Sequence, residues 1–275
     1  MPGTITYQHE QKADQIKLIV TDLDSTLLRR DKTISAYTKS VFARCREKGI
    51  LTAFATARSE NSCGRITGIL DPDAIISNGG AGVRIGDKQI YRAAMSVETT
   101  NRLLLVFLET PGVGYITADT DRGYFVNYPL DENDPGWNPG WIEYLPAFEA
   151  DFSRGLDCDA FKITVELPDD NTAFRIVSAF PSVNVIPFSG EKWYRFADIN
   201  AGKWNGVKAL AAHTGIALTN IAAFGDDFSD IEMVKHSGAG VAVSNAIDEV
   251  KAAAGYVCAD CDDDGPAKWI AENIL

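Results

Sequence analysis

The chain has little of what a membrane protein or a nucleic-acid-binding protein needs. Its 275 residues include no apolar run long enough to cross a bilayer, and its first residues, MPGTITYQHEQKADQIK, are polar rather than a signal sequence. Acidic residues outnumber basic ones by 38 to 26, and the formal charge of −12 argues against nucleic acid or anionic lipid as a partner. We expect a cytoplasmic protein with no membrane, nucleic-acid or obligate protein partner.

Cysteine and histidine are also scarce, which bears on disulfides and on zinc. The five cysteines are scattered and odd in number, a usage that suits reduced thiols better than a disulfide framework. Cys258 and Cys261 form a CxxC pair, but no second ligand pair stands at a suitable spacing and the three histidines do not cluster. We therefore interpret this pair as two ordinary thiols near a strand end.

Both ends of the chain alternate between buried strands and helices. Near-continuous apolar runs with β-branched residues, such as IKLIVTDL at 16–23, are typical of strands buried on both faces of a parallel sheet. Ser35 and Gly49 fit the N-cap and C′ positions of the helix that follows. The pattern predicts an α/β fold with a doubly wound, Rossmann-like parallel-sheet core. Its further strands are expected at 50–57, 73–78, 220–227, 239–244 and 255–259.

The character of the chain changes between residues 86 and 189. A helical pattern at 94–109 precedes a predicted antiparallel hairpin at 112–129, and more strands and a helix follow. We expect an inserted α+β cap domain at 86–189, with residues 1–85 and 190–275 meeting in space to form the core. Because ligands of open α/β sheets bind outside the carboxyl ends of the strands, the insert is expected to act as a lid over a substrate.

Carboxylates follow two of the predicted core strands. Asp22 and Asp24 come directly after the first strand, and Asp226 and Asp227 end a later one, with Asp230 four residues beyond Asp226. Strand ends can converge at one edge of a doubly wound sheet, so these side chains are expected to form an acidic cluster. Mutually repelling carboxylates need a cation, and hard oxygen ligands favour Mg²⁺.

These residues resemble the motifs of the haloacid dehalogenase (HAD) superfamily. DLDSTLL at 22–28 is similar to motif I, FATAR at 54–58 to motif II, and GDDFSD at 225–230 to motif IV. The segment ISNGG at 76–80, the C-terminal region and the position of the insert resemble the Cof-like branch, which carries a type IIB cap. The resemblance covers nearly the whole chain. It implies a HAD core with a cap and a phosphatase that acts on a small phosphorylated metabolite.

The resemblance also implies roles for the acidic residues. Asp22 is the expected nucleophile, which forms an aspartyl phosphate, and Asp24 the expected general acid and then general base. Mg²⁺ is expected to bind Asp22, the backbone carbonyl of Asp24, and Asp226, with Asp230 in or just outside the set of metal ligands. Asp227 is expected to be solvated or to lie just outside that set as well.

The phosphate is expected to be bound by the turns that follow the first three strands. The Thr56 hydroxyl and backbone amides after Asp22 are the expected donors. Ser25 and Ala57 replace the family's usual glycines, which is tolerable if φ is negative at both. Arg58 is equally suited to substrate binding and to a structural role. The expected phosphate- and substrate-binding set is Thr56, Ser25, Ala57, Arg58, Asn78 and Gly79.

Three further assignments rest on position in the sequence. Lys203 is the expected motif III lysine because it aligns with the family's helix and stands in a first turn near the strand ends; Lys192 and Lys208 are the alternatives. Asn245 is interpreted as the N-cap of the following helix rather than as part of the ligand crevice. The aromatic residues of the loop near 137–144 either line the substrate pocket or pack the cap's own core.

The leading hypothesis is a Mg²⁺-dependent phosphatase whose substrate is a sugar phosphate. A phosphomutase of the same superfamily is the alternative, since a cap that retains a bisphosphate would allow transfer in place of hydrolysis. A non-enzymatic phospho-receiver domain is disfavoured, because such a domain lacks an acid two residues after its nucleophile and has a shorter, uninterrupted chain.

Overall fold

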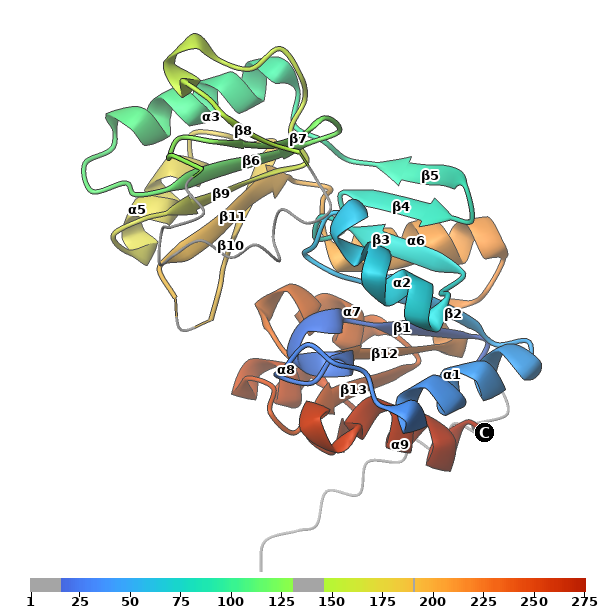
Figure 1. Cartoon of the computed structure of the whole chain (residues 1–275). Helices are drawn as coiled ribbons and strands as arrows, with labels where there is room; N and C mark the ends of the chain where they lie inside the picture. Colours follow the sequence, from blue (N-terminus) through green and yellow to red (C-terminus); the bar gives the residue numbers. More distant parts are fainter. Residues whose placement is uncertain (1–15, 131–145, 190) are drawn as a thin grey trace, which may run out of the picture.

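The computed structural model describes residues 16–130, 146–189 and 191–275. Figure 1 shows two β-sheets, each with its own helices, joined where the chain passes from one to the other. The larger is the core sheet, of eight strands, and the smaller is the cap sheet, of six. The predicted α/β core with an inserted α+β cap is confirmed.

The core sheet is parallel except at one edge. Its strand order is β14-β13-β12-β1-β2-β3-β4-β5, and all pairs from β14 to β3 are parallel. Strands β4 and β5 pair antiparallel and extend the sheet beyond the predicted parallel set. The strands are β1 (Leu18–Thr21), β2 (Leu51–Ala55), β3 (Ala74–Ser77), β4 (Gly82–Ile85), β5 (Lys88–Arg92), β12 (Ile221–Gly225), β13 (Ala239–Val243) and β14 (Tyr256–Cys258).

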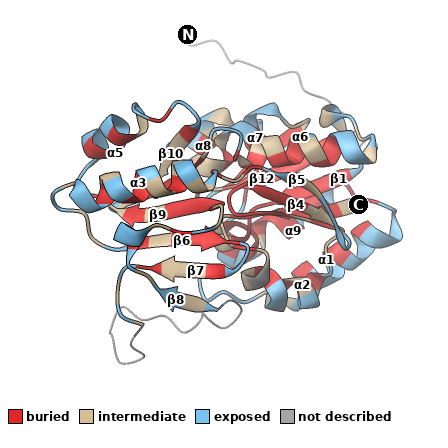
Figure 2. Cartoon of the chain, turned by 90° about the horizontal axis from the view of Figure 1, so that it is seen from above, coloured by how far each residue is buried: buried red, intermediate tan, exposed pale blue. Residues whose placement is uncertain are grey.

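Helices cover both faces of the core sheet, as Figure 2 shows from above. Their inward faces are buried and their outward faces exposed. One layer holds α1 (Ala36–Glu47), α2 (Gly64–Leu70) and α9 (Gly265–Asn273); the other holds α6 (Lys203–Thr214), α7 (Ile231–His236) and α8 (Asp248–Ala253). Ser35 caps α1 as predicted, because its hydroxyl accepts a hydrogen bond from the Thr38 amide at 2.9 Å, and Gly49 has a φ of +70°.

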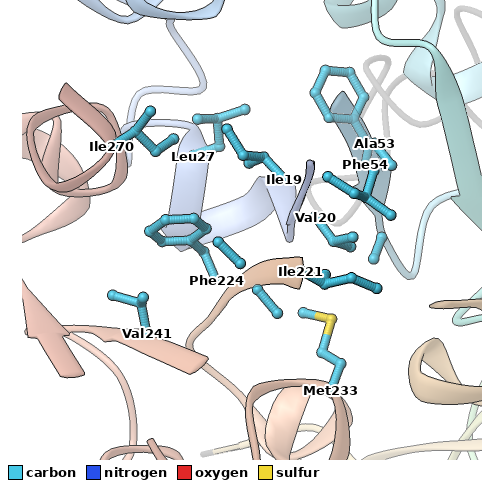
Figure 3. Close-up of a cluster of buried hydrophobic side chains, with 14 of the residues drawn as sticks. Ile19, Val20, Leu27, Ala53, Phe54, Ile221, Phe224, Met233, Val241 and Ile270 are labelled. Atoms are coloured by element: carbon cyan, nitrogen blue, oxygen red, sulfur yellow. The ribbon is translucent and has the colours of Figure 1, made fainter. Parts of the chain in front are cut away.

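The buried strands meet the helices in one large apolar cluster. Ile19 and Val20 of β1, Phe54 of β2 and Phe224 of β12 are fully buried in this cluster, part of which Figure 3 shows. Burying a large apolar side chain contributes about 1.5–3 kcal/mol to folding. This packing explains the continuous apolar runs, and it fixes the strand ends where the polar residues begin.

The cap is a sheet with helices on one face. Its strand order is β10-β11-β9-β6-β7-β8, and its helices α3 and α5 share a buried apolar cluster with residues such as Ile163 and Phe196. The predicted hairpin is formed by β6 and β7. The elements are α3 (Val97–Glu109), β6 (Ile116–Thr120), β7 (Gly123–Val126), β8 (Ala147–Glu149), β9 (Lys162–Glu166), α5 (Asp170–Val177), β10 (Val183–Pro187) and β11 (Trp193–Asp198).

The sheets and the predicted domain limits do not coincide strand for strand. Strand β5 belongs to the core sheet although it lies within 86–189, and β11 belongs to the cap sheet although it lies within 190–275. The division into 1–85 with 190–275 and 86–189 stays a prediction. No helix among the described residues is both long and apolar enough to cross a bilayer.

Candidate active site

Three carboxylates gather where β1 and β12 end. Asp22 follows β1 and is hydrogen-bonded to the neighbouring strand β12, since its amide donates to the Phe224 carbonyl at 3.0 Å. Carboxylate oxygens of Asp22, Asp226 and Asp230 all lie within 4.8 Å of one another. Asp22 is 6% exposed and Asp230 fully buried, so their charges need compensation within the protein. Three of the five carboxylates that were expected to cluster therefore do so in the structure, and Asp24 and Asp227 are not among them.

Lys203 supplies part of that compensation. It is the first residue of α6, 3% exposed, and its Nζ donates to Asp22 Oδ1 at 2.7 Å and to Asp230 Oδ1 at 2.6 Å. Lys192 and Lys208 are exposed, and the Lys208 ammonium lies 6.0 Å from the centre of the Trp204 ring. Of the three candidate lysines, only Lys203 contacts the acidic cluster.

The charges of the cluster perturb one another. Burial raises the pKa of Asp22 well above its usual range, an effect that the Lys203 ammonium opposes and the Asp230 carboxylate reinforces. Burial and then the nearby Asp230 carboxylate raise the pKa of Asp226 to about 7. Burial alone would lower the pKa of Lys203, but the carboxylates of Asp22 and Asp230 outweigh it and raise that pKa. One ammonium among three carboxylates leaves an excess of negative charge, and a divalent cation fits this donor set.

Asp230 has a second task besides pairing with Lys203. Its Oδ2 accepts hydrogen bonds from the amides of Asp226 and Asp227 at 3.1 and 3.2 Å. Because both oxygens of Asp230 already accept hydrogen bonds, this residue is better placed to orient the loop than to bind a metal ion directly. Asp227 caps the same turn, since its carboxylate accepts from the Phe228 amide at 2.8 Å.

Asp24 lies beside two cations. Arg58 donates to both of its oxygens, each at 2.7 Å, and Lys32 Nζ donates to Oδ1 at 2.8 Å. Burial alone would raise the pKa of Asp24, but the hydrogen bonds and charges of Arg58 and Lys32 outweigh it and lower that pKa to about 2. Arg58 was expected either to bind substrate or to have a structural role, and in the structure its guanidinium holds the Asp24 carboxylate. Lys32 was not anticipated, because it comes from an exposed loop that the motifs do not include.

The turn after Asp22 differs from expectation at Ser25. Its φ is +59°, so the condition of a negative φ is not met at Ser25, whereas Ala57 is not among the residues with positive φ. The side chain of Asn245 supports this turn by donating to the Ser25 carbonyl at 2.7 Å and accepting from the Cys261 amide at 3.0 Å. The N-cap assignment of Asn245 is therefore wrong, because α8 begins three residues later, at Asp248, and its N-cap residue is Ile247. A hydrogen bond between residues that are 220 positions apart, such as Asn245 and Ser25, leaves no local signal in the sequence.

The loops after β2 and β3 form a second wall of the site. The Gly79 amide donates to the Thr56 carbonyl at 2.8 Å, and the Asn78 amide donates to the Arg58 carbonyl at 2.7 Å. Asn78 and Gly79 have φ values of +52° and +67°. These hydrogen bonds hold the loop of Thr56, Ala57 and Arg58 against the loop of Asn78 and Gly79, and the binding of phosphate by these residues stays a prediction.

Thr26 and two cap residues, Lys162 and Tyr124, also contact the residues of the site and were not predicted from the sequence. Thr26 is fully buried, and its hydroxyl donates to Asp226 Oδ1 at 2.6 Å. From the cap, Lys162 Nζ donates to the Ala57 carbonyl at 2.6 Å, and the hydroxyls of Tyr124 and Ser59 share a hydrogen bond of 2.9 Å. The aromatic residues near 137–144 lie outside the described residues.

The segment that leads from the last cap strand, β11, to α6 of the core packs against the loop after β3. Arg195 of β11 is fully buried and donates to the Gly79 carbonyl at 2.8 Å. At Gly80, φ is +95°, and a Cβ there would lie 2.1 Å from the carbonyl carbon of Gly202. Only glycine allows the two backbones to approach so closely at Gly80.

This fold and site define an enzyme of the HAD superfamily. Residues 19–270 match the family model described as haloacid dehalogenase-like hydrolase, and the chain belongs to that family. The expected membership is confirmed.

Individual relatives and solved structures are similar over nearly the whole chain. The Bacillus subtilis protein named 5-amino-6-(5-phospho-D-ribitylamino)uracil phosphatase YitU is 25% identical over 264 residues, which cover 93% of this chain and 96% of that protein. The solved structure described as the HAD subclass IIB sugar phosphatase BT4131 has a TM-score of 0.82 at 23% identity, covering 94% of this chain and all of that one. BT1666, a phosphatase from Bacteroides thetaiotaomicron, has a TM-score of 0.80 at 20% identity and covers 99% and 100%.

Proposed function

We propose that the chain is a Mg²⁺-dependent phosphatase that hydrolyses a small phosphorylated metabolite, a sugar phosphate, through an aspartyl-phosphate intermediate. The observation that carries the proposal is the position of Asp22, which is buried at the end of β1, paired with Lys203 and followed two residues later by Asp24. Family membership and relatives named as phosphatases support it.

Each carboxylate has a distinct task in this proposal. Asp22 attacks phosphorus, so that an oxygen–phosphorus bond to Asp22 forms while the bond to the leaving alkoxide breaks. Lys203 holds Asp22 in place and offsets negative charge at the transferring phosphoryl group. Asp22, the carbonyl of Asp24 and Asp226 would hold Mg²⁺, which supplies charge neutralisation at the phosphoryl oxygens when bound. Asp230 orients Asp226 through the loop amides.

Asp24 must change partners to act as an acid. Before substrate binds, Asp24 would be ionised at neutral pH, because Arg58 and Lys32 lower its pKa to about 2. A bound phosphate dianion competes for both cations, and loss of these partners lets the carboxyl take up the proton that it then gives to the leaving alkoxide. In the second step the Asp24 carboxylate takes a proton from the water that attacks the aspartyl phosphate.

The proposal is tested by measuring phosphate release from a panel of phosphorylated metabolites with Mg²⁺. The wild-type chain should hydrolyse at least one sugar phosphate, and Asp22→Asn should abolish turnover of every ester, because an amide does not form the aspartyl phosphate. Thermal unfolding of the variant checks that the loss is not a loss of fold. Full turnover by folded Asp22→Asn would show that another group is the nucleophile.

A further inference from the structure

A row of polar side chains crosses the cap sheet on the face away from its helices. Tyr124 of β7 and Lys162 of β9 both stand directly opposite Asp119 of β6 in the antiparallel register. Directly opposite residues share a face of the sheet and the next residue along each strand points to the other side. Ile163, the next residue, packs in the apolar cluster under the helices, so this row faces the other way.

The row lies against the loop that carries the phosphate-binding residues. The hydrogen bond from Lys162 Nζ reaches the carbonyl of Ala57, which stands between Thr56 and Arg58. The Tyr124 hydroxyl meets Ser59 in the same loop. Arg58, in the same loop, binds Asp24. The row is therefore separated only by this loop from the carboxylate proposed to protonate the leaving group.

Asp119 is incompletely satisfied in this row. It is 3% exposed, and its Oδ1 has no hydrogen-bond partner among the described residues. Lys162 Nζ forms an ion pair with that oxygen at 3.6 Å, a distance too long for a hydrogen bond. A buried carboxylate oxygen without a donor is costly and calls for a ligand that supplies one. Lys162 uses one of its three N–H groups on Ala57 and can offer another.

We propose that Asp119 and Lys162 bind a hydroxyl of an uncharged, hydroxyl-bearing leaving group, and so determine which phosphate esters the enzyme accepts. A hydroxyl can donate to Asp119 Oδ1 and at the same time accept from Lys162 Nζ. A carboxylate would be repelled by Asp119, and an ammonium by Lys162. This inference rests on the proposed phosphatase function and extends it to the residues that select the alcohol.

The test compares esters that differ in the leaving group. The probes are glycerol 3-phosphate, glucitol 6-phosphate and glucose 6-phosphate as hydroxylated esters, gluconate 6-phosphate as an anionic one, and p-nitrophenyl phosphate as an ester without a hydroxyl. The wild-type chain should prefer glucitol 6-phosphate to gluconate 6-phosphate. Asp119→Leu should lower kcat/KM for the best hydroxylated ester by about tenfold or more, the usual effect of losing a partner for a buried polar group, with p-nitrophenyl phosphate hydrolysis nearly unchanged.

Two further variants keep the test decisive. Asp119→Asn preserves the shape of the side chain and serves if the leucine variant does not fold. It should lower the ratio of kcat/KM for the hydroxylated ester to that for p-nitrophenyl phosphate, to a smaller extent than leucine does. Asp121→Leu is the matched control, because Asp121 is in the same cap hairpin with a side chain 61% exposed, and it should leave the ratio unchanged.

Three results separate the outcomes. Equal losses on hydroxylated and nitrophenyl esters would mean that Asp119 only supports the fold. Wild-type hydrolysis of p-nitrophenyl phosphate but of no hydroxylated ester would overturn this inference and leave the phosphatase activity standing. Failure to hydrolyse any ester with Mg²⁺ present would overturn the proposed function itself, and this inference with it.

Discussion

Replacing Asp119 by asparagine should stabilise the folded chain at neutral pH, and the gain should shrink in mild acid. Burial raises the pKa of Asp119 from an ordinary 3.8 to about 6, although the nearby Lys162 opposes the shift. The folded carboxyl thus binds its proton more tightly than the unfolded one. The stability that this binding contributes is complete below pH 3.8 and is lost as the pH rises through about 6.

The size of the effect follows from the two pKa values. A difference of about 2 pH units at about 1.36 kcal/mol each comes to about 3 kcal/mol of unfolding free energy lost by the wild-type chain above pH 7 or so. Asparagine stays neutral at every pH and avoids this loss. Roughly half of the gain should appear between pH 5 and pH 8, because the unfolded carboxyl is already largely ionised at about pH 5.

The assay is urea unfolding of the wild-type chain and Asp119→Asn at about pH 5, 6, 7 and 8, with the difference in unfolding free energy plotted against pH. All other titrating groups are shared and cancel in that difference. Asp121→Asn serves as the control, since its side chain is 61% exposed and its curve should run parallel to that of the wild type. If the Asp119→Asn curve is also parallel to the wild-type curve, Asp119 is not a destabilised buried carboxylate and the reasoning fails.

The remaining predictions concern the reaction. Turnover should require Mg²⁺ and fail with Ca²⁺, because the larger ion favours more ligands and would misplace Asp22 for attack; full turnover in EDTA would contradict the metal assignment. Lys203→Ala should lower kcat by about 100-fold or more, whereas Lys208→Ala, at an exposed position of the same helix, should change it little; a greater loss in the second variant would mean that the wrong lysine was assigned. Asp24→Asn should block hydrolysis of sugar phosphates yet release a burst of about one equivalent of nitrophenolate from p-nitrophenyl phosphate, since that leaving group needs no proton but the second step lacks its base. Equal losses on both esters without a burst would refute the role of Asp24.

The sequence was most informative where chemistry follows directly from a strand. The apolar run of β1 predicts its own burial, and the residues just after it, Asp22 and Asp24, must then lie at the sheet edge. The same reasoning placed Asp226 beside them from 200 residues away, because β1 and β12 pair in register. The antiparallel edge strands β4 and β5 were not anticipated, since two short strands next to the insert resemble its own strands.

Features that depend on distant contacts could not be read from local patterns. Asn245 looks like a helix cap in the sequence, yet its side-chain amide donates a hydrogen bond to the carbonyl of Ser25, which is distant in the sequence. The positive φ of Ser25 is likewise imposed by the turn and its tertiary ties rather than by the residue type. Asp119 and Lys162 give no signal at all, because each is a single polar residue in a strand and their relation appears only once β6 and β9 pair.

The close approach of Gly80 to Gly202 has a mechanical consequence. Lys203 stands only five residues after the last cap strand, so a displacement of the cap would be passed along the chain to the ammonium beside Asp22. The backbone just before Lys203 is also packed against the loop after β3, because any side chain at Gly80 would collide with Gly202. The Lys203 ammonium is thus fixed twice, by its hydrogen bonds to Asp22 and Asp230 and by the packing of the backbone that precedes it.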